Sequence, residues 1–469
     1  MKGRKQKTLS VDGGYPIGNR AEPEGLWGAQ TFMWINENSL VTVQPNSREL
    51  LELIVSPSNM NEAYKRVKRN GGAGGVDQMD VEKLLPYLQV HGEALINSIK
   101  GGTYCPNPVR RVEIPKDNGK TRPLGIPTVV DRVVQQAISQ VLMPIYDHTF
   151  SDNSYGFRPR RSTHGALRKV QKYVTAGYIY CVSLDLEKFF DTVSHSKLIE
   201  VLSRRIKDGR VISLIHKYLN AGVMVGGKYE ETPLGVPQGG PLSPVLSNIM
   251  LNELDKELER RGHKFVRYAD DCMILCKSRR SAERTRQSIT KYVEERLYLK
   301  VNREKTHVGY IGRGIKYLGY SFWIMKGKCN LCLHAKTKAR LTSKLKELTG
   351  RSNGMGYEQR KTALTRYIRG WMEYYKLAEC KNFLQATDQW YRRRLRMCIW
   401  KCWKKVKTRF TNLMKCGISR NQAWQWANTR KGHWRIADSA ILKRAIDNEK
   451  LKISGYPSLM GYYTRLHVQ

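Results

Sequence analysis

The chain has 469 residues and a formal charge of +41, from 82 lysines and arginines against 41 aspartates and glutamates. Hydrophobic residues make up 41% of the sequence, too many for a disordered chain, and no run approaches the length of a membrane span. A positive excess of this size favours a polyanionic partner, because each phosphate that a lysine or arginine neutralises releases a condensed counterion. We therefore expect a nucleic-acid-binding protein of two or three domains, cytoplasmic in a bacterial-type cell and without a signal peptide.

Residues 1–104 are expected to form an N-terminal extension. Apolar residues follow a helical spacing from Ser47 to Lys100, and the glycine-rich segment Gly71–Gly75 interrupts it. A glycine-rich loop can cradle a phosphate, but no strand precedes this one and no Gly-Lys-Ser/Thr sequence follows it. A flexible connector is the favoured interpretation.

Residues 105–334 mix short strands with helices, a pattern typical of an α+β fold. In one segment, Val182, Leu184 and Leu186 alternate with polar residues, which predicts a strand with one buried face. Asp185 then lies on the opposite face, at the end of that strand.

A second segment, residues 265–275, places Ala269-Asp270-Asp271 between two apolar stretches. This pattern predicts a β-hairpin whose tight turn carries two adjacent carboxylates. Two carboxylates so close repel each other unless a cation lies between them. Together with Asp185 on a neighbouring strand, they fit a pair of Mg²⁺ ions that serve an in-line phosphoryl displacement.

The ten cysteines are scattered along the chain, which favours free thiols. Cys329, Cys332 and His334 allow a zinc site, but no second cysteine pair follows at the required spacing. The favoured interpretation is a β-hairpin that turns at Lys326-Gly327.

After residue 334 the spacing of apolar residues is almost entirely helical. Residues 335–469 contain 31 lysines and arginines, 8 acidic residues and seven of the ten tryptophans. Basic residues interleaved with large aromatic ones suit a surface that follows phosphates, although a solvated charged face is the alternative. One helix here is expected to bury five residues: Leu384, Tyr391, Leu395, Cys398 and Cys402.

Several short motifs accompany the carboxylates in a fixed order. In the first 334 residues they are Pro115-Lys116, Arg122–Pro127, Tyr155–Pro159, Ser183–Asp191, Gly235–Pro244, Tyr268–Asp271, Asn302–Lys305 and Tyr317–Tyr320. Later segments are Gly370–Tyr375, Trp390–Lys405 and Asn428–Arg435. This succession resembles the reverse transcriptases encoded by group II introns, from the fingers and palm through the maturase-specific region to the short terminal segment.

The resemblance implies roles for single residues. The implied metal ligands, of which the three aspartates are also catalytic, are Asp185, Leu186, Asp270 and Asp271. The implied contacts to the incoming deoxynucleotide are Lys116, Arg122, Phe190, Gln238 and Lys305. The implied RNA-binding residues are Arg110, Arg392, Arg393, Arg396, Lys401, Lys404 and Lys405.

Four of the nucleotide contacts have simpler alternatives. Lys116 and Arg122 flank an Asn-Gly turn, so they could be ordinary surface charges of a hairpin. Lys305 could simply be an exposed lysine. Phe190 stands where the family carries a bulky ring against the sugar 2′ position, which favours deoxynucleotides, but it could also be a second core residue beside Phe189.

The resemblance implies an α+β right-hand polymerase with an antiparallel palm sheet, followed by an all-α thumb and a small basic domain. The expected divisions are 1–104 (extension), 105–334 (fingers and palm), 335–410 (thumb) and 411–469 (nucleic-acid-binding domain). The chain ends at Gln469 without the paired cysteines and histidines of an HNH nuclease, so we expect no such activity.

The implied activity is RNA-directed DNA synthesis with two Mg²⁺ ions, joined to a maturase role in intron splicing and mobility. The implied partners are group II intron RNA, an RNA template with a DNA primer, target DNA and deoxynucleoside triphosphates, with no membrane; the oligomeric state is left open. Two alternatives remain: an RNA-binding splicing factor without polymerase activity, and a domesticated relative in repair or antiviral defence.

Overall fold

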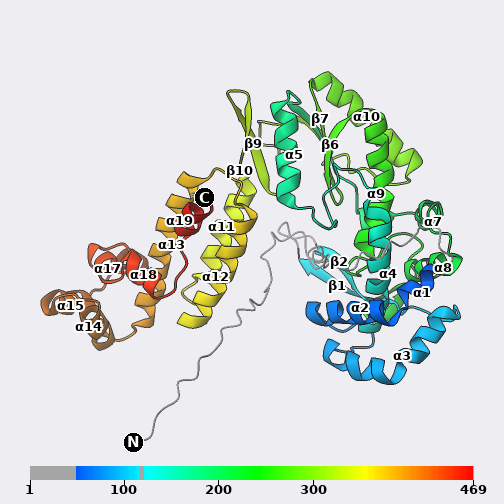
Figure 1. Cartoon of the computed structure of the whole chain (residues 1–469). Coiled ribbons are helices and arrows are strands. Elements are labelled where there is room, and N and C mark those ends of the chain that lie inside the picture. Colours follow the sequence, from blue (N-terminus) through cyan, green and yellow to red (C-terminus); the bar gives the residue numbers. More distant parts are fainter. Residues whose placement is uncertain (1–48, 116–120, 468–469) are drawn as a thin grey trace, which may run out of the picture. The chain divides into compact units, whose positions relative to one another are not determined.

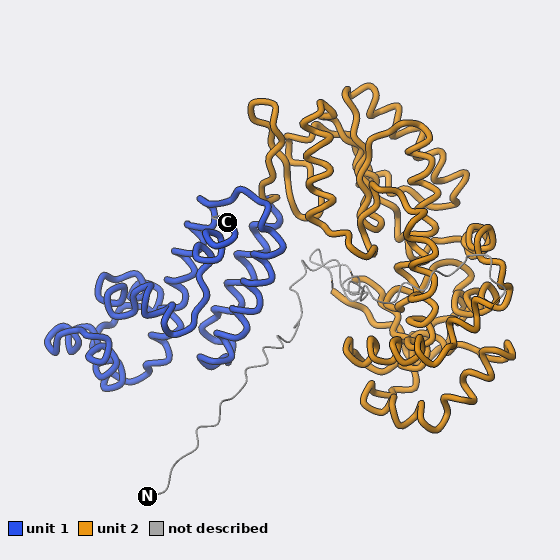
Figure 2. Tube along the Cα trace, in the orientation of Figure 1, with its two compact units in different colours: residues 1–23, 335–469 blue, residues 24–334 orange. Residues whose placement is uncertain are grey.

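The computed structural model describes residues 49–115 and 121–467 (Figure 1). Within this part, the chain divides after His334 into two compact units (Figure 2). In chain order, the part up to His334 (orange in Figure 2) is here called the first unit, and the part from Ala335 (blue) the second unit. The division falls where the sequence predicted the thumb to begin. No comparable break separates residues 49–104 from the following ones, which belong to the same unit.

The first unit begins with helices. They are α1 (Leu50–Ile54), α2 (Pro57–Asn70), the 3-10 helix η1 (Val81–Lys83) and α3 (Leu84–Lys100). The hydroxyl of Ser56 caps α2 by accepting from the N–H of Asn59, and Pro57 occupies the first turn, where no amide hydrogen is needed. Helix α2 packs along α4 (Val129–Asp147), so this helical part shares the core of the unit.

The glycine-rich segment 71–75 is held by two arginines. Arg110 donates from Nε (3.1 Å) and Nη2 (2.7 Å) to the carbonyl of Gly74, and Arg132 donates to the carbonyl of Ala73. The expectation of a flexible connector is therefore wrong. It failed because the arginines that fix the loop lie 36 and 59 residues further along the chain.

The first sheet has the strand order β2-β1-β4-β5. Its strands are β1 (Val109–Pro115), β2 (Thr121–Ile126), β4 (Val223–Val225) and β5 (Lys228–Glu230). β1 and β2 are antiparallel, with Arg110 opposite Ile126, and β1 runs parallel to β4. This pairing places the Arg122–Pro127 motif beside β1, whose Arg110 bonds to the glycine-rich segment.

The second sheet is antiparallel throughout, in the order β6-β7-β3-β8. Its strands are β3 (Tyr180–Leu184), β6 (Lys264–Tyr268), β7 (Asp271–Cys276) and β8 (His307–Tyr310). Val182, Leu184 and Leu186 are buried, as the alternation predicted. The remaining helices of this unit are α5 (Thr163–Thr175), α6 (Phe189–Thr192), α7 (His195–Ser203), α8 (Gly209–Leu219), α9 (Ser243–Arg260) and α10 (Arg279–Arg296). Helix α10 packs on β3, β7 and β8, while α5 and α9 pack on β6.

A two-stranded hairpin of β9 (Tyr320–Met325) and β10 (Lys328–Leu333) ends the first unit and packs on α5. It turns at Lys326-Gly327, both with positive φ, which confirms the predicted turn.

The second unit contains only helices among its described residues, which confirms the expected change from α+β to all-α. They are α11 (Ala335–Leu348), α12 (Tyr357–Tyr374), α13 (Lys381–Cys402), α14 (Val406–Lys415), α15 (Arg420–Ala427), α16 (His433–Ile436), α17 (Ala440–Ala445), α18 (Asn448–Ile453) and α19 (Leu459–His467). α13 contacts α11, α16 and α19. The boundary predicted between 410 and 411 falls inside α14, so a division there would cut a helix.

The buried face of α13 was predicted correctly for four residues: Leu384, Tyr391, Leu395 and Cys398 are each at most 2% exposed. Cys402, the last residue of the helix, is exposed.

Candidate active site

The strand pairing of the second sheet brings the three carboxylates to one end. β3 and β7 are antiparallel with Leu184 opposite Cys272, so the next position along β3, Asp185, lies opposite Asp271. Tyr268 pairs with Asp271 at the end of the β6–β7 hairpin, which leaves only Ala269 and Asp270 in the turn. The predicted hairpin is confirmed. The strand register places all three aspartates at the same end of the sheet.

The turn has a tight conformation. Ala269 has a φ of 56°, in the left-handed region that favours glycine. Gly156 of the Tyr155–Pro159 motif lies directly against it, since a Cβ at Gly156 would come within 2.2 Å of the backbone nitrogen of Ala269. The Tyr155 N–H also donates to the carbonyl of Arg267 at 2.8 Å. The glycine of this motif is therefore required for the chain to approach the Ala269–Asp270 turn.

A buried arginine supports the same turn and was missed by the sequence analysis. The guanidinium of Arg267 is inaccessible to solvent and pairs with both carboxylate oxygens of Asp255 on α9. Its Nη1 donates to the carbonyl of Ala269 at 2.9 Å and to Asn248 Oδ1 at 3.1 Å. The Asn248 amide in turn donates to the carbonyl of Gly156 at 2.9 Å. An arginine within an apolar strand was the available signal, because a buried guanidinium requires partners.

The electrostatics of the three aspartates indicate a place for cations. Burial raises the pKa of Asp270, which is offset in part by the positive charge of Arg122 and increased by Asp185. Desolvation of the carboxylate by the surrounding atoms and the negative charges of Asp270 and Asp185 raise the pKa of Asp271 to about 7, although the residue keeps an exposed surface. Carboxylates destabilised in this way are stabilised by hard divalent ions.

Lys305 provides a positive charge at the same place. Its Nζ lies 3.1 Å from Oδ2 of Asp185, so two of the predicted site residues form an ion pair. The segment before β8 also supports Asp185 through Thr306, whose hydroxyl accepts from the Asp185 N–H at 3.1 Å. The Asp185 carboxylate therefore lies beside a positive charge, and its oxygens are of the kind that hard divalent ions prefer.

Leu186, the fourth implied metal ligand, has a buried side chain and forms a bridge with Val301. Only its main-chain oxygen has the chemistry to bind a metal. Among the described residues, no group of three or more His, Cys, Asp or Glu side chains has the geometry of a formed metal site.

Two of the implied nucleotide contacts meet each other. Nε of Arg122 donates to Oε1 of Gln238 at 2.9 Å, which joins the Arg122–Pro127 motif to the Gly235–Pro244 motif. The backbones of the two motifs are also joined, because the N–H of Gly125 donates to the carbonyl of Gln238 at 2.7 Å. Gly239 lies so close that a Cβ there would be 2.4 Å from the carbonyl oxygen of Gly125. Lys116 lies outside the described residues.

Phe190 differs from its neighbour Phe189 in its surroundings. Phe189 is 2% exposed and belongs to the core, while Phe190 is only partly buried and stands edge-on to it at 5.3 Å. Phe190 lines a cavity of about 340 Å³ together with Gln238, Gly125 and the Glu230–Gln238 segment. The ring therefore faces the space beside the predicted nucleotide contacts.

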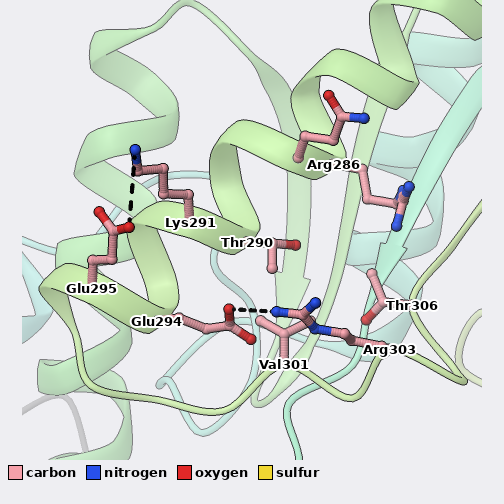
Figure 3. Close-up of a pocket in the computed structure, with 9 residues that line it drawn as sticks. Arg286, Thr290, Lys291, Glu294, Glu295, Val301, Arg303 and Thr306 are labelled. Atoms are coloured by element: carbon pink, nitrogen blue, oxygen red, sulfur yellow. Dashed lines mark hydrogen bonds and ion pairs between the residues drawn. The ribbon is translucent and has the colours of Figure 1, made fainter.

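A second cavity, of about 360 Å³, lies along α10 and the segment before β8 (Figure 3). Four of its charged residues pair with each other, as Arg303–Glu294 at 2.9 Å and Lys291–Glu295 at 3.9 Å. The fifth, Arg286, pairs at 3.1 Å with Glu283 outside the lining, so every cation of this cavity already has an acidic partner. Thr306, whose hydroxyl bonds to the Asp185 N–H, also lines this cavity.

The predicted RNA-binding arginines of α13 are engaged within the protein. Arg396 is 6% exposed and donates to the carbonyl of Ile446 at 2.7 Å. Arg392 pairs with Asp388 at 2.7 Å and Arg393 with Asp438 at 3.3 Å. Of these three arginines only Arg396 is buried, and all three already have partners within the protein, so their binding to RNA stays a prediction.

The other predicted RNA-binding residues differ among themselves. Arg110 is engaged with the glycine loop, and Lys401 donates to the carbonyl of Arg351. Lys404 and Lys405 are exposed. Of the seven predicted residues these two are the ones classed as exposed, and RNA binding by any of the seven stays a prediction.

Three carboxylates at one end of a sheet suit phosphoryl transfer assisted by bound divalent ions. This chemistry is typical of a nucleotide polymerase and not of a binding module. Residues 114–322 match the family described as reverse transcriptase (RNA-dependent DNA polymerase). Residues 338–417 match the group II intron, maturase-specific domain. The chain belongs to the group II intron reverse transcriptase family, which joins these two domains.

Two curated proteins and one solved structure are similar to parts of this chain. Protein YkfC of Escherichia coli (strain K12) is 36% identical over 313 residues, covering 58% of this chain and 82% of YkfC. The group II intron-encoded protein LtrA of Lactococcus lactis subsp. cremoris is 30% identical over 357 residues, covering 62% of this chain and 59% of LtrA. Among solved structures, a chain of a partial Cas6-RT-Cas1–Cas2 complex is similar over 55% of this chain and 43% of its own, with 26% identity and a TM-score of 0.33.

None of the described helices combines the length and the apolar character needed to cross a bilayer.

Proposed function

We propose that the chain extends the 3′ end of a DNA primer with deoxynucleotides, reading an RNA template. The reaction takes place at the end of the sheet where Asp185, Asp270 and Asp271 lie. The observation that carries this proposal is the strand register, which gathers the three carboxylates at one end of an antiparallel sheet. The Arg122–Gln238 pair and the cavity lined by Phe190 supply contacts of the kind that a triphosphate and a sugar need.

We infer that the three aspartates hold two Mg²⁺ ions, with the Leu186 carbonyl as a further oxygen ligand. Bound divalent ions of this kind lower the pKa of the attacking hydroxyl and neutralise the triphosphate. The protein contributes position and charge: Arg122 offers a guanidinium to phosphate oxygens, Gln238 orients the nucleotide, and Lys305 places a positive charge beside Asp185. Arg267 fixes the turn from which Asp270 projects.

The same chain is proposed to bind group II intron RNA and to assist its splicing and mobility. This role requires affinity and not chemistry, and the excess of basic residues after 334 supplies it. The RNA template, the DNA primer and the target DNA are proposed as further partners.

Primer extension tests the polymerase assignment. Asp270→Asn should lower the rate of DNA synthesis on the order of 1000-fold or more, because the carboxylate charge is lost where cations must bind. RNA affinity should stay unchanged, since it comes from distant basic residues. Asp152→Asn is the matched control, because its side chain is 85% exposed and pairs with Arg161 away from the turn.

Near-normal synthesis by the Asp270→Asn protein would disprove the catalytic assignment. A wild-type protein that promotes intron splicing but extends no primer would instead favour the splicing factor without polymerase activity.

A further inference from the structure

Helices α14 and α15 pack against each other and carry an exposed apolar strip. Val406, Phe410 and Met414 recur every four residues and so share one face of α14. Val406 and Met414 are 38% and 39% exposed, and the indole of Trp424 on α15 is 60% exposed. Trp424 stands edge-on to Phe410 at 5.9 Å, which leaves much of its ring open to solvent.

The surroundings of this strip are strongly basic. Between Asp388 and Asp438 the sequence contains fourteen lysines and arginines and no acidic residue. Those on α13 are engaged within the protein, but the exposed ones around α14 and α15 are not. Seven exposed side chains make no hydrogen bond or ion pair with the described residues: Lys404, Lys405, Lys407, Lys415, Arg420, Arg430 and Arg435.

Two further aromatic rings in the same stretch already carry cations on their faces. Arg393 lies 3.9 Å from the ring centre of Trp434, and Lys431 lies 5.1 Å from that of Trp426. Burial and the nearby charges of three basic residues, Arg351, Arg409 and Lys401, lower the pKa of His433, which indicates a positive potential in this region. Trp424, by contrast, has no cation over its ring among the described residues.

We propose that the surface formed by Trp424 and Lys404, Lys405 and Lys407, here called the α14–α15 surface, binds unpaired nucleotides of a nucleic-acid strand. A base stacks on the indole of Trp424, and the lysines neutralise the neighbouring phosphates. An exposed aromatic ring among unpaired cations is the arrangement that binds single strands, because every unpaired base offers a face for stacking. A duplex offers only its backbone, since its bases already stack on each other.

This inference rests on the proposed nucleic-acid-binding function and narrows it to one surface and one kind of strand. A second copy of the chain is a poorer occupant, because two such surfaces would bring unpaired positive charges together without an acidic residue to offset them.

The first experiment compares a 12-nucleotide single-stranded RNA with an RNA hairpin duplex, using the full chain. Trp424→Ala should weaken binding of the single strand by roughly 5- to 150-fold and leave the duplex almost unaffected. Trp424→Phe should keep most of the affinity, because it keeps an aromatic face. Ile453→Ala, at a residue that is 83% exposed, is the control for loss of an exposed apolar side chain.

The second experiment measures how affinity for the single strand depends on salt. Replacing Lys404, Lys405 and Lys407 by alanine should reduce the slope of log affinity against log salt by about two, at roughly 0.7 for each phosphate contact. Arg393→Ala should leave the slope unchanged, because its charge is already paired with Asp438.

Several outcomes would overturn the proposal. An unchanged single-strand affinity in Trp424→Ala, an equal loss for single strand and duplex, or an unchanged salt slope in the lysine variant would each do so. A fall in the mass of the particle by light scattering, with affinity retained, would identify the strip as a contact between copies. Extension of a preannealed primer at saturating protein should survive Trp424→Ala, so failure here is distinct from failure of the proposed polymerase.

Discussion

Arg267 lies in β6 between Val266 and Tyr268, with a guanidinium that solvent does not reach. Such a charge is stable only where every donor finds a partner, and its partners here include the carbonyl of Ala269. Because Ala269 has a positive φ, the peptide that leads into Asp270 needs this external support. We interpret Arg267 as a positioning residue for the catalytic turn.

Arg267→Lys tests this interpretation, since lysine keeps the charge but cannot bind Asp255 with two donors and still reach Ala269. We expect primer extension to slow by roughly 10- to 100-fold and the Mg²⁺ concentration for half-maximal rate to rise. Arg210→Lys is the control, because Arg210 of α8 pairs with the buried Asp208, the residue that caps this helix. A wild-type Mg²⁺ requirement in Arg267→Lys would show that the pair serves stability alone.

Phe190 is predicted to select the sugar. If its ring closes the space beside the 2′ carbon, Phe190→Val should raise incorporation of ribonucleotides relative to deoxynucleotides by roughly 10- to 200-fold. The check is single-nucleotide incorporation of both substrates by one preparation. A loss of activity for both with their ratio preserved would mean that Phe190 only packs beside Phe189.

At the scale of elements, alternation and turn composition predicted β3, the β6–β7 hairpin and the β9–β10 hairpin, because these signals are local. α13 shows where local signals end. Its period of 3.6 residues identified the buried face correctly, yet it could not reveal that residues near 446 return to cover Arg396. The pairing of Arg122 with Gln238, 116 residues apart, was likewise out of reach of periodicity.

Arg396 should therefore matter for stability. Arg396→Ala removes the donors to the carbonyl of Ile446 and to Asn448 Oδ1, and the buried Ile446 carbonyl loses this partner. We expect a loss of about 3 kcal/mol in the free energy of unfolding, measured by urea denaturation. Arg366→Ala, at an exposed position of α12, should cost less than about 0.5 kcal/mol. Equal effects of the two substitutions would contradict the buried role of Arg396.

At the scale of the whole molecule, the division after His334 predicts two thermal transitions for the full chain. Mg²⁺ should raise only the transition of the unit that carries the aspartates, because binding stabilises the unit that binds. Calorimetry of the wild-type protein and of Arg396→Ala assigns the transitions, since that substitution should lower only the other one. A single transition that shifts as a whole would contradict the division.

The effect of Mg²⁺ on that transition should also depend on pH. The pKa of Asp271 is raised from 3.8 to about 7, so below pH 7 a metal ion must displace a proton. The increase in melting temperature should accordingly be larger at pH 8 than at pH 6. Without metal the pH dependence of stability has the opposite sign. Because ionisation of Asp271 is unfavourable in the folded unit, the free energy of unfolding falls as the pH rises from 3.8 to about 7. A larger Mg²⁺ effect at pH 6 would contradict the raised pKa.

The separation between engaged and solvent-facing cations in the helical unit has a practical consequence for handling the protein. Salt at about 1 M shortens the screening length to about 3 Å, which weakens contacts between exposed lysines and phosphates but scarcely reaches a buried guanidinium. A concentrated salt wash should thus strip cellular nucleic acid from the protein during purification without loosening α13 from the helices that cover it. The purified chain would then be free of copurifying RNA and ready for defined templates.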